Sequence, residues 1–170
     1  MSIVVDILLL QTVSIAIASA GVFAAAVYYI FQLRHQSKVR QTDLVLRVWQ
    51  TTCTEEMVRS WHRLLSAEYD DLDDFTKKYG QPFSDNPVPV AFTLIAMFHE
   101  GLGVSLHRKV MDVDLIRNFF AVGWAWQKIR PIAEGLRKQG SSATFRWVEY
   151  LYNEVEKRQQ QLEQKGAKNG

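Results

Sequence analysis

His99 and Glu100 are the adjacent side chains in this sequence whose types could most readily bind a metal ion or exchange a proton. A zinc site of the HExxH type needs a second histidine one helical turn after the first, so that both imidazoles reach the same ion. Gly103 occupies that position. The next histidine, His107, would lie about 12 Å further along a helix. We therefore predict no metal site here and interpret His99 and Glu100 as a core or interface pair.

Two other groups of reactive side chains have simpler structural interpretations. Cys53 lies between Trp49 and Met57 on an apolar helical stripe, with no base beside it in sequence, which favours a small buried core residue over a nucleophile. The aspartates within residues 70–74 lack the glycine and the distal glutamate of a calcium-binding loop, and acids are expected in the first turn of a helix. We predict no catalytic residue, no metal and no cofactor.

Charge and cysteine content narrow the classes of partner and compartment. The 20 basic and 18 acidic residues are interleaved and leave a net charge of only +2, so no nucleic-acid-binding surface is indicated. A single cysteine cannot form an intramolecular disulfide, which fits a reducing compartment.

The element that must position everything else is an apolar run at residues 7–31, which contains no Asp, Glu, Lys or Arg. As a helix it would be roughly 37 Å long, enough to cross a hydrocarbon core of about 30 Å. A cleaved signal peptide is the alternative, but no Lys or Arg precedes the run, and the run exceeds the usual length of a signal's apolar region. We predict an uncleaved, single-pass transmembrane helix, with the lipid bilayer as its partner.

The charges on either side of this run predict its orientation. Residues 1–6 carry only Asp6, whereas the basic juxtamembrane segment at residues 32–41 follows the span. By the positive-inside rule, residues 1–6 lie outside the cell (inner) membrane and the C-terminal domain is cytoplasmic. The residues expected at the membrane interface are Tyr28, Tyr29, Arg34, Lys38 and Arg40.

One face of the predicted span carries small side chains that would let a second helix approach closely. These candidate helix–helix contact residues are Ala16, Ala20, Gly21 and Ala24. They predict either self-association or docking on another membrane protein.

Residues 42–158 are predicted to form an all-α cytoplasmic domain, a bundle of four or five helices. Apolar residues spaced by three or four describe one stripe through residues 46–65, in which Thr52 or Thr54 could start a second helix. The predicted core residues are Trp49, Trp61, Leu64, Phe92, Leu94, Phe98, Phe119, Phe120, Val148 and Leu151.

Local signals predict several boundaries within this domain. Residues 80–89 have the composition of a loop, and the apolar run that follows is too short to span a membrane. This run favours a core helix, and a helix that lies partly on the membrane is the alternative. Asp112 is expected to cap a helix that Pro131 kinks or ends. The last helix begins after residues 140–142, and the polar tail at residues 159–170 is predicted to be disordered.

The order of residues from 98 to 151 resembles a family of short, uncharacterised prokaryotic proteins with one N-terminal span and a small helical domain of unknown function. The residues that carry the resemblance are Phe98-x-Glu100-x-Leu102-Gly103, Asp112, Trp126-x-x-Ile129-x-Pro131-Ile132, Arg137 and Phe145-x-x-Val148-Glu149-Tyr150-Leu151. The resemblance implies a membrane anchor that carries a helical module, and it supplies no activity.

The sequence as a whole favours a membrane-anchored interaction module at the cytoplasmic face of the membrane. Two alternatives stay open. One is a membrane-bound, metal-dependent enzyme that uses His99 and Glu100, and the other is an accessory subunit of a larger membrane complex.

Overall fold

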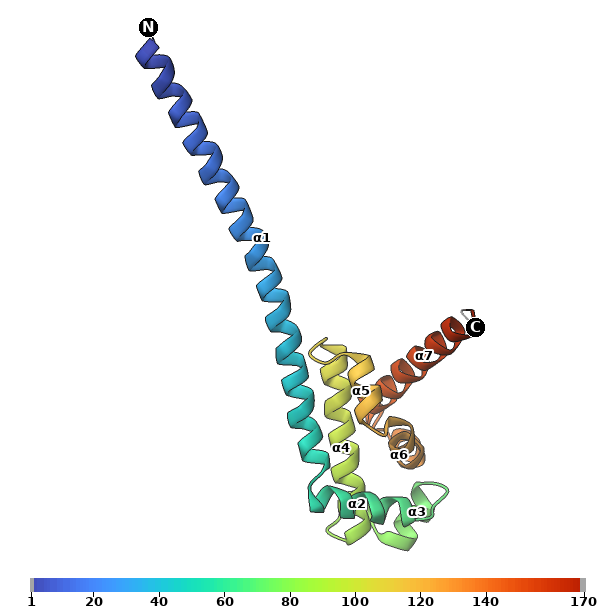
Figure 1. Ribbon diagram of the computed structural model, residues 1–170. Coiled ribbons are helices and arrows are strands. Elements are labelled where there is room, and N and C mark those ends of the chain that lie inside the picture. The colour runs from blue at the N-terminus through green and yellow to red at the C-terminus, as the bar shows by residue number, and fades with distance from the viewer. Residues whose placement is uncertain (1, 169–170) are drawn as a thin grey trace. The chain divides into compact units, whose positions relative to one another are not determined.

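The computed structural model describes residues 2–168 and the side chains of residues 11–167, and all regular structure in this range is helical, as predicted. Met1, the side chains of residues 7–10 in the predicted span, and the last two residues of the predicted tail lie outside this description. The helices are α1 (Ser2–Thr52), α2 (Glu55–Ser66), α3 (Leu72–Tyr79), α4 (Pro87–His107), α5 (Val113–Phe119), α6 (Val122–Lys138) and α7 (Arg146–Lys168) (Figure 1).

The chain divides into two compact units, one ending at Thr42 and the other starting at Asp43. The first unit is formed by α1, whose side chains are exposed from residue 11 to residue 40. The second unit holds the end of α1 and the whole of α2 to α7. Among the residues that the structure describes, this unit therefore has more helices than the four or five predicted for the domain.

The junction of α1 and α2 shows which of the two threonines starts a new helix. After α1 ends at Thr52, the Thr54 hydroxyl oxygen accepts a hydrogen bond of 3.3 Å from the Met57 backbone N–H and so caps α2. The turn between the helices interrupts the apolar stripe and leaves Cys53 exposed. The prediction of a buried Cys53 was wrong, because it assumed one unbroken helical phase.

Local capping explains the start of α3 and α4. The Asp71 carboxylate accepts a hydrogen bond of 2.8 Å from the Asp74 backbone N–H, which confirms that the acidic cluster marks a helix start. The loop that follows ends at Asn86, earlier than predicted, because Pro87 serves as the first helical residue, where no N–H is needed. The apolar run belongs to the longer helix α4, which continues to His107.

The region after Asp112 contains two helices where one was predicted. Asp112 caps α5 as predicted, since its carboxylate accepts a hydrogen bond of 2.8 Å from the Asp114 backbone N–H. The helix then ends at Phe119, and Phe120 adopts an extended backbone conformation. This break lets both Phe120 and Val122 reach the same buried cluster, which a continuous helix would place on different faces.

Pro131 was predicted to kink or end its helix. It lies inside α6, which continues to Lys138, so it does not end the helix. The missing N–H of Pro131 would have bonded to the carbonyl of Gln127. Because Gln127 is exposed, water can replace that hydrogen bond.

The last helix, α7, begins at Arg146 and continues to Lys168, so the prediction of disorder from residue 159 was wrong for the residues that the structure describes. Side-chain hydrogen bonds stabilise the C-terminal part of this helix. Gln159 accepts a hydrogen bond of 2.9 Å from the Arg117 guanidinium of α5 and donates one of 2.9 Å to Glu163 one turn later.

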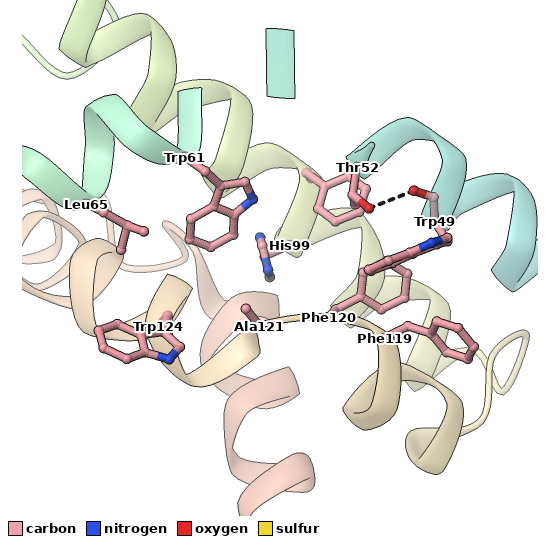
Figure 2. A pocket seen from close by; sticks show the side chains of 10 residues that line it. Trp49, Thr52, Trp61, Leu65, His99, Phe119, Phe120, Ala121 and Trp124 are labelled. Carbon is pink, nitrogen blue, oxygen red and sulfur yellow. Dashed lines mark hydrogen bonds between the residues drawn. The ribbon is translucent and has the colours of Figure 1, made fainter. Parts of the chain in front are cut away.

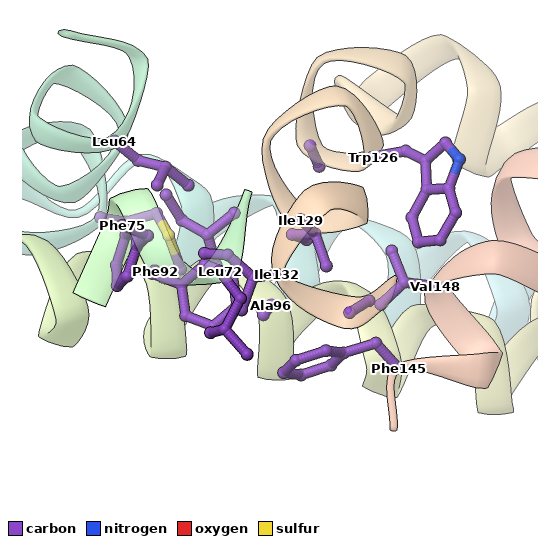
Figure 3. Packing of buried hydrophobic residues seen from close by; sticks show 14 residues of the cluster. Leu64, Leu72, Phe75, Phe92, Ala96, Trp126, Ile129, Ile132, Phe145 and Val148 are labelled. Carbon is purple, nitrogen blue, oxygen red and sulfur yellow. The ribbon is translucent and has the colours of Figure 1, made fainter. Parts of the chain in front are cut away.

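Two clusters of buried side chains hold the second unit together, and α4 contributes to both. The first joins α2, α3, α4, α6 and α7, and Figure 3 shows Phe92 and Ala96 of α4 between side chains of α2–α3 and α6–α7. The second joins the end of α1 to α4, α5, α6 and α7. Its buried members are Val45, Leu102, Met111, Ile116, Phe120, Val122 and Leu151.

Most of the predicted core residues are buried or partly buried. Leu64, Phe92, Val148 and Leu151 are fully buried, and Phe120 is 7% exposed. The partly buried ones are Trp61, Leu94, Phe98 and Phe119. Trp49 is a correction, because 38% of its surface is exposed. Its indole lines a pocket, described next, and does not fill a core.

Candidate functional site

The most distinctive concave feature of the second unit is an aromatic pocket with a volume of about 390 Å³. Figure 2 shows its side chains around His99, and they come from α1, α2, α4, α5, α6 and the break between α5 and α6. The lining residues are Trp49, Thr52, Trp61, Leu65, Phe98, His99, Phe119, Phe120, Ala121 and Trp124.

The helix breaks described above create this pocket. The α1–α2 turn follows Trp49 and Thr52, and α2 then supplies Trp61. The α5–α6 break places Phe120 and Ala121 in the lining, where the Phe120 ring contacts Trp49. A continuous helix through either break would direct these side chains around a single axis, so both interruptions are needed to enclose the space.

Edge-to-face contacts between aromatic rings fix the walls. The Trp49 indole lies with its ring centroid 5.6 Å from that of Phe119 and 6.1 Å from that of Phe120. The His99 imidazole lies 5.7 Å from Trp61 and 5.3 Å from Phe98, in both cases nearly perpendicular. Such ring pairs are favoured beyond the area they bury, so they stabilise the arrangement of the side chains that line the pocket.

His99 is the polar group at the centre of this surface, and only 1% of it is exposed. Its Nδ1 atom lies 2.8 Å from the Ile95 carbonyl oxygen. A carbonyl can only accept, so Nδ1 carries the proton in this contact. The other ring nitrogen, Nε2, is buried and has no hydrogen-bond partner.

Burial also determines the charge of His99. Removal from water lowers the pKa of its imidazole to about 4, and the hydrogen bond to Ile95 opposes this only in part. The ring is therefore neutral at physiological pH. With the proton on Nδ1, Nε2 presents an unused lone pair that can accept a hydrogen bond.

The pocket's hydroxyl group is already used. Thr52 donates a hydrogen bond of 2.6 Å from its Oγ1 to the Trp49 carbonyl oxygen, the contact drawn as a dashed line in Figure 2. Among the residues that line the pocket, His99 is the one with a buried, unpartnered polar side-chain atom in the described part of the chain.

Glu100 serves a different purpose from its neighbour. Its Oε2 atom accepts hydrogen bonds from the backbone N–H groups of Trp147 (3.1 Å) and Val148 (2.9 Å), in the first turn of α7. Partial burial raises the pKa of the Glu100 carboxyl group, although these two hydrogen bonds and nearby arginines act in the opposite direction. Glu100 is thus a helix cap supplied by another helix.

The candidate metal ligands are not brought together. The His107 imidazole packs against the Trp147 indole, with ring centroids 4.6 Å apart, while His99 faces the pocket and Glu100 faces α7. Within the part of the chain that the structure describes, no three His, Cys, Asp or Glu side chains are grouped as they would be around a metal ion.

The residues predicted at the membrane lie in the first unit, and all of them are exposed. These are the predicted interface residues Tyr28, Tyr29, Arg34, Lys38 and Arg40, and the candidate helix–helix contact residues Ala16, Ala20, Gly21 and Ala24. Their contacts with lipid or with a second helix stay predictions.

Two helices in the described residues are long and apolar enough to cross a membrane by length and composition alone. One is α1 from Gln11 onward, whose apolar window is entirely unburied. The other is α4, whose apolar window is 44% buried. Burial among neighbouring helices accounts for the apolar character of α4, whereas nothing within the first unit covers α1. A signal sequence would pass the same test of length and composition as α1.

Sequence reasoning identified several of the pocket's residues but assigned them to a core. The spacing of Trp124 and Trp126 gave the one available signal, because residues two apart on a helix cannot both face the same core. In the structure Trp126 is buried and Trp124 is 64% exposed. The two helix breaks that open the pocket have no counterpart in the hydrophobic pattern.

In comparisons with protein-family models, curated proteins and solved structures, none matches this chain. The family resemblance of residues 98–151 stays a prediction.

Proposed function

We propose that this chain is a membrane-anchored helical interaction module, held in the cell membrane by α1, with its second unit at the cytoplasmic face. The observation that carries the proposal is that every side chain from residue 11 to residue 31 is uncharged and exposed. Exposed apolar surface costs about 25 cal/mol per Å² in water, so a helix of this kind has a large free-energy gain on entering lipid.

The flanking residues support an orientation with the second unit inside. Arg34, Lys38 and Arg40 follow the apolar run and are exposed, which favours their retention on the cytoplasmic side. Tyr28 and Tyr29 would then lie at the inner interface, where amphipathic rings are stabilised.

Membrane fractionation tests the anchor. The full chain is expressed in a bacterial host, and its membranes are washed with alkaline carbonate, which removes peripheral proteins. We expect the chain to stay in the membrane pellet with the mass of the uncleaved sequence. Recovery in the soluble fraction, or a mass that shows cleavage within the apolar run, would overturn the proposal.

Cys53 provides a direct test of orientation, because it is the single cysteine, is exposed, and lies in the second unit. A membrane-impermeant maleimide should modify Cys53 in inside-out vesicles and leave it unmodified in intact spheroplasts. A Cys53→Ser variant should be unmodified in both preparations. A Cys53→Ser/Ser2→Cys variant should show the reverse of the native pattern, and modification of native Cys53 in spheroplasts would contradict a cytoplasmic domain.

An interaction role draws support from apolar side chains that the second unit leaves in solvent. Trp124 is 64% exposed and Phe83 is 59% exposed, and aromatic side chains are enriched in protein interfaces. Confinement to the membrane would raise the effective concentration of such surfaces near a membrane partner. Mild detergent extraction with mass spectrometry of cross-linked chains tests this role, and recovery of the cross-linked chain as a monomer alone would argue against it.

A further inference from the structure

The unpartnered Nε2 of His99 requires a physical explanation. Leaving a buried acceptor without a hydrogen bond costs about 1–3 kcal/mol, and buried polar atoms of this kind are rare in folded proteins. His99 Nε2 has no partner, and the same ring lines a pocket of about 390 Å³. The acceptor and the adjacent space together suggest a missing hydrogen-bond donor.

The walls limit what that donor can be attached to. Apart from His99 and Thr52, every residue that lines the pocket is aromatic or aliphatic, and no carboxylate, lysine or arginine is among them. Aromatic rings can attract a cation, but no carboxylate in the lining offsets the cost of removing its charge from water, and an anionic ligand would be repelled by the Nε2 lone pair. The chemistry of the walls therefore favours a neutral molecule.

Size and shape narrow the ligand further. Pockets for small molecules typically have volumes of about 300–1,000 Å³ and combine apolar walls with a few polar groups that fix orientation. This pocket lies at the small end of that range, and the aromatic rings of Trp49, Trp61 and Phe120 are among those that line it. A planar molecule of one or two fused rings could stack against such rings.

We propose that this pocket binds a neutral, planar, apolar small molecule of the phenol or indole class, which donates one hydrogen bond to Nε2 of His99. His99 thereby supplies orientation and selectivity, while the aromatic walls supply most of the affinity. Binding involves no covalent step.

The test uses the full chain in lipid nanodiscs and three probes, 1-naphthol, naphthalene and 1-fluoronaphthalene. The probes share a ring system, but only 1-naphthol can donate a hydrogen bond. Equilibrium dialysis measures retention above that of protein-free nanodiscs of the same lipid. We expect wild type to bind 1-naphthol about tenfold more tightly than 1-fluoronaphthalene, the ratio that one satisfied hydrogen bond would give.

Two variants and one control assign the effect to the pocket. His99→Phe keeps an aromatic ring and removes the acceptor, so the preference for 1-naphthol should fall to that of the lipid alone. Ala121→Trp places an indole in the pocket from an exposed position, so all three probes should be lost. Met97→Ala is the control. Met97 lies on α4, as His99 does, but it is exposed and outside the pocket lining, so this variant should bind all three probes as wild type does.

A second measurement keeps the proposal testable if His99→Phe does not fold. In the wild type, ¹⁵N-histidine spectra report the hydrogen bond directly, since the Nε2 resonance of His99 should shift with 1-naphthol and stay unchanged with 1-fluoronaphthalene. Absence of probe retention above protein-free nanodiscs, equal affinity for donor and non-donor probes, or full binding by Ala121→Trp would each overturn the proposal.

Discussion

The Glu100 carboxylate of α4 caps α7 by accepting a hydrogen bond of 2.9 Å from the Val148 backbone N–H, and the same oxygen accepts one of 3.1 Å from Trp147. The residue before α7, Phe145, has a positive φ of 54° and an apolar side chain that cannot cap. An acid on a different helix therefore takes the place of the usual N-cap residue and also meets the positive end of the α7 dipole.

The first prediction concerns this cap. Glu100→Ala should lower the free energy of unfolding by about 1–3 kcal/mol, because two partly buried N–H groups lose a charged acceptor. Chemical denaturation of the detergent-solubilised chain, followed by circular dichroism, measures the change. Glu134→Ala removes an exposed carboxylate that pairs with Arg130 within α6, and should cost no more than about 0.5 kcal/mol. Equal losses in the two variants would contradict the capping role.

The second prediction concerns the crossing of α4 and α7. A Cβ atom added to Gly103 would lie 2.1 Å from the Trp147 carbonyl oxygen, a contact that only a shift of backbone can relieve. Gly103→Ala should therefore destabilise the chain by about 1–3 kcal/mol in the same denaturation experiment.

Gly101 offers a matched control for Gly103 on the same helix. A Cβ atom at Gly101 would meet nothing within 4 Å. Since alanine favours helix over glycine, Gly101→Ala should stabilise the chain by about 0.5–1 kcal/mol. A neutral result for Gly103→Ala would show that the two helices separate more easily than the close approach implies.

The third prediction concerns the pair that ties α7 to α5. The Arg158 guanidinium donates two hydrogen bonds to the Asp114 carboxylate, of 2.8 Å from Nε and 2.6 Å from Nη2. Arg158→Lys should lower the free energy of unfolding, because lysine cannot form the two-pronged contact, although screening by water keeps the loss small.

Hydrogen exchange of backbone amides would localise the effect of Arg158→Lys. We expect faster exchange in the part of α7 that follows Val155. Arg59→Lys, in an exposed pair with Glu55 within α2, is the matched control and should leave exchange and stability unchanged. Unaltered exchange in α7 for Arg158→Lys would mean that the pair with Asp114 does not order this helix.

The fourth prediction concerns the pH dependence of stability. The pKa of His99 is about 4 in the folded chain, against 6.5 for an ordinary histidine, because burial disfavours the charged ring. As pH falls below 6.5, the unfolded chain binds a proton that the folded chain excludes. The contribution of the neutral His99 to the free energy of unfolding is therefore complete above pH 6.5. This contribution should decline by roughly 3 kcal/mol by pH 4.

Comparison with His99→Phe isolates this titration. The pKa of Glu100 is raised in the folded chain, so the folded chain takes up this proton more readily as pH falls. The effect partly offsets the loss of stability that His99 causes at low pH. It is present in both wild type and His99→Phe, so it cancels in their comparison. The difference in unfolding free energy between wild type and His99→Phe should shift in favour of the variant between pH 6.5 and 4. A difference independent of pH would show that His99 is accessible to water in the folded chain.

The sequence by itself determined features that depend on neighbouring residues. The helical character of the described residues followed from the spacing of apolar residues, the start of α3 from the acidic cluster at residues 70–74, and the cap of α5 from Asp112, whose side chain reaches a backbone N–H two residues later. The apolar character of α1 could also be predicted from the sequence, because it is a property of one uninterrupted stretch of residues.

Only the tertiary structure decided which of these residues meet. Cys53 lost its predicted burial because the break before α2 changes the helical phase, and hydrophobic periodicity contains no signal for such a break. Trp49, which precedes the break, is partly exposed because its indole lines a pocket. His99 and Glu100 are adjacent in the chain, yet neighbouring positions on a helix point about 100° apart. One therefore faces an aromatic pocket and the other caps α7, because the groups that receive them come from distant segments whose packing the linear order does not specify.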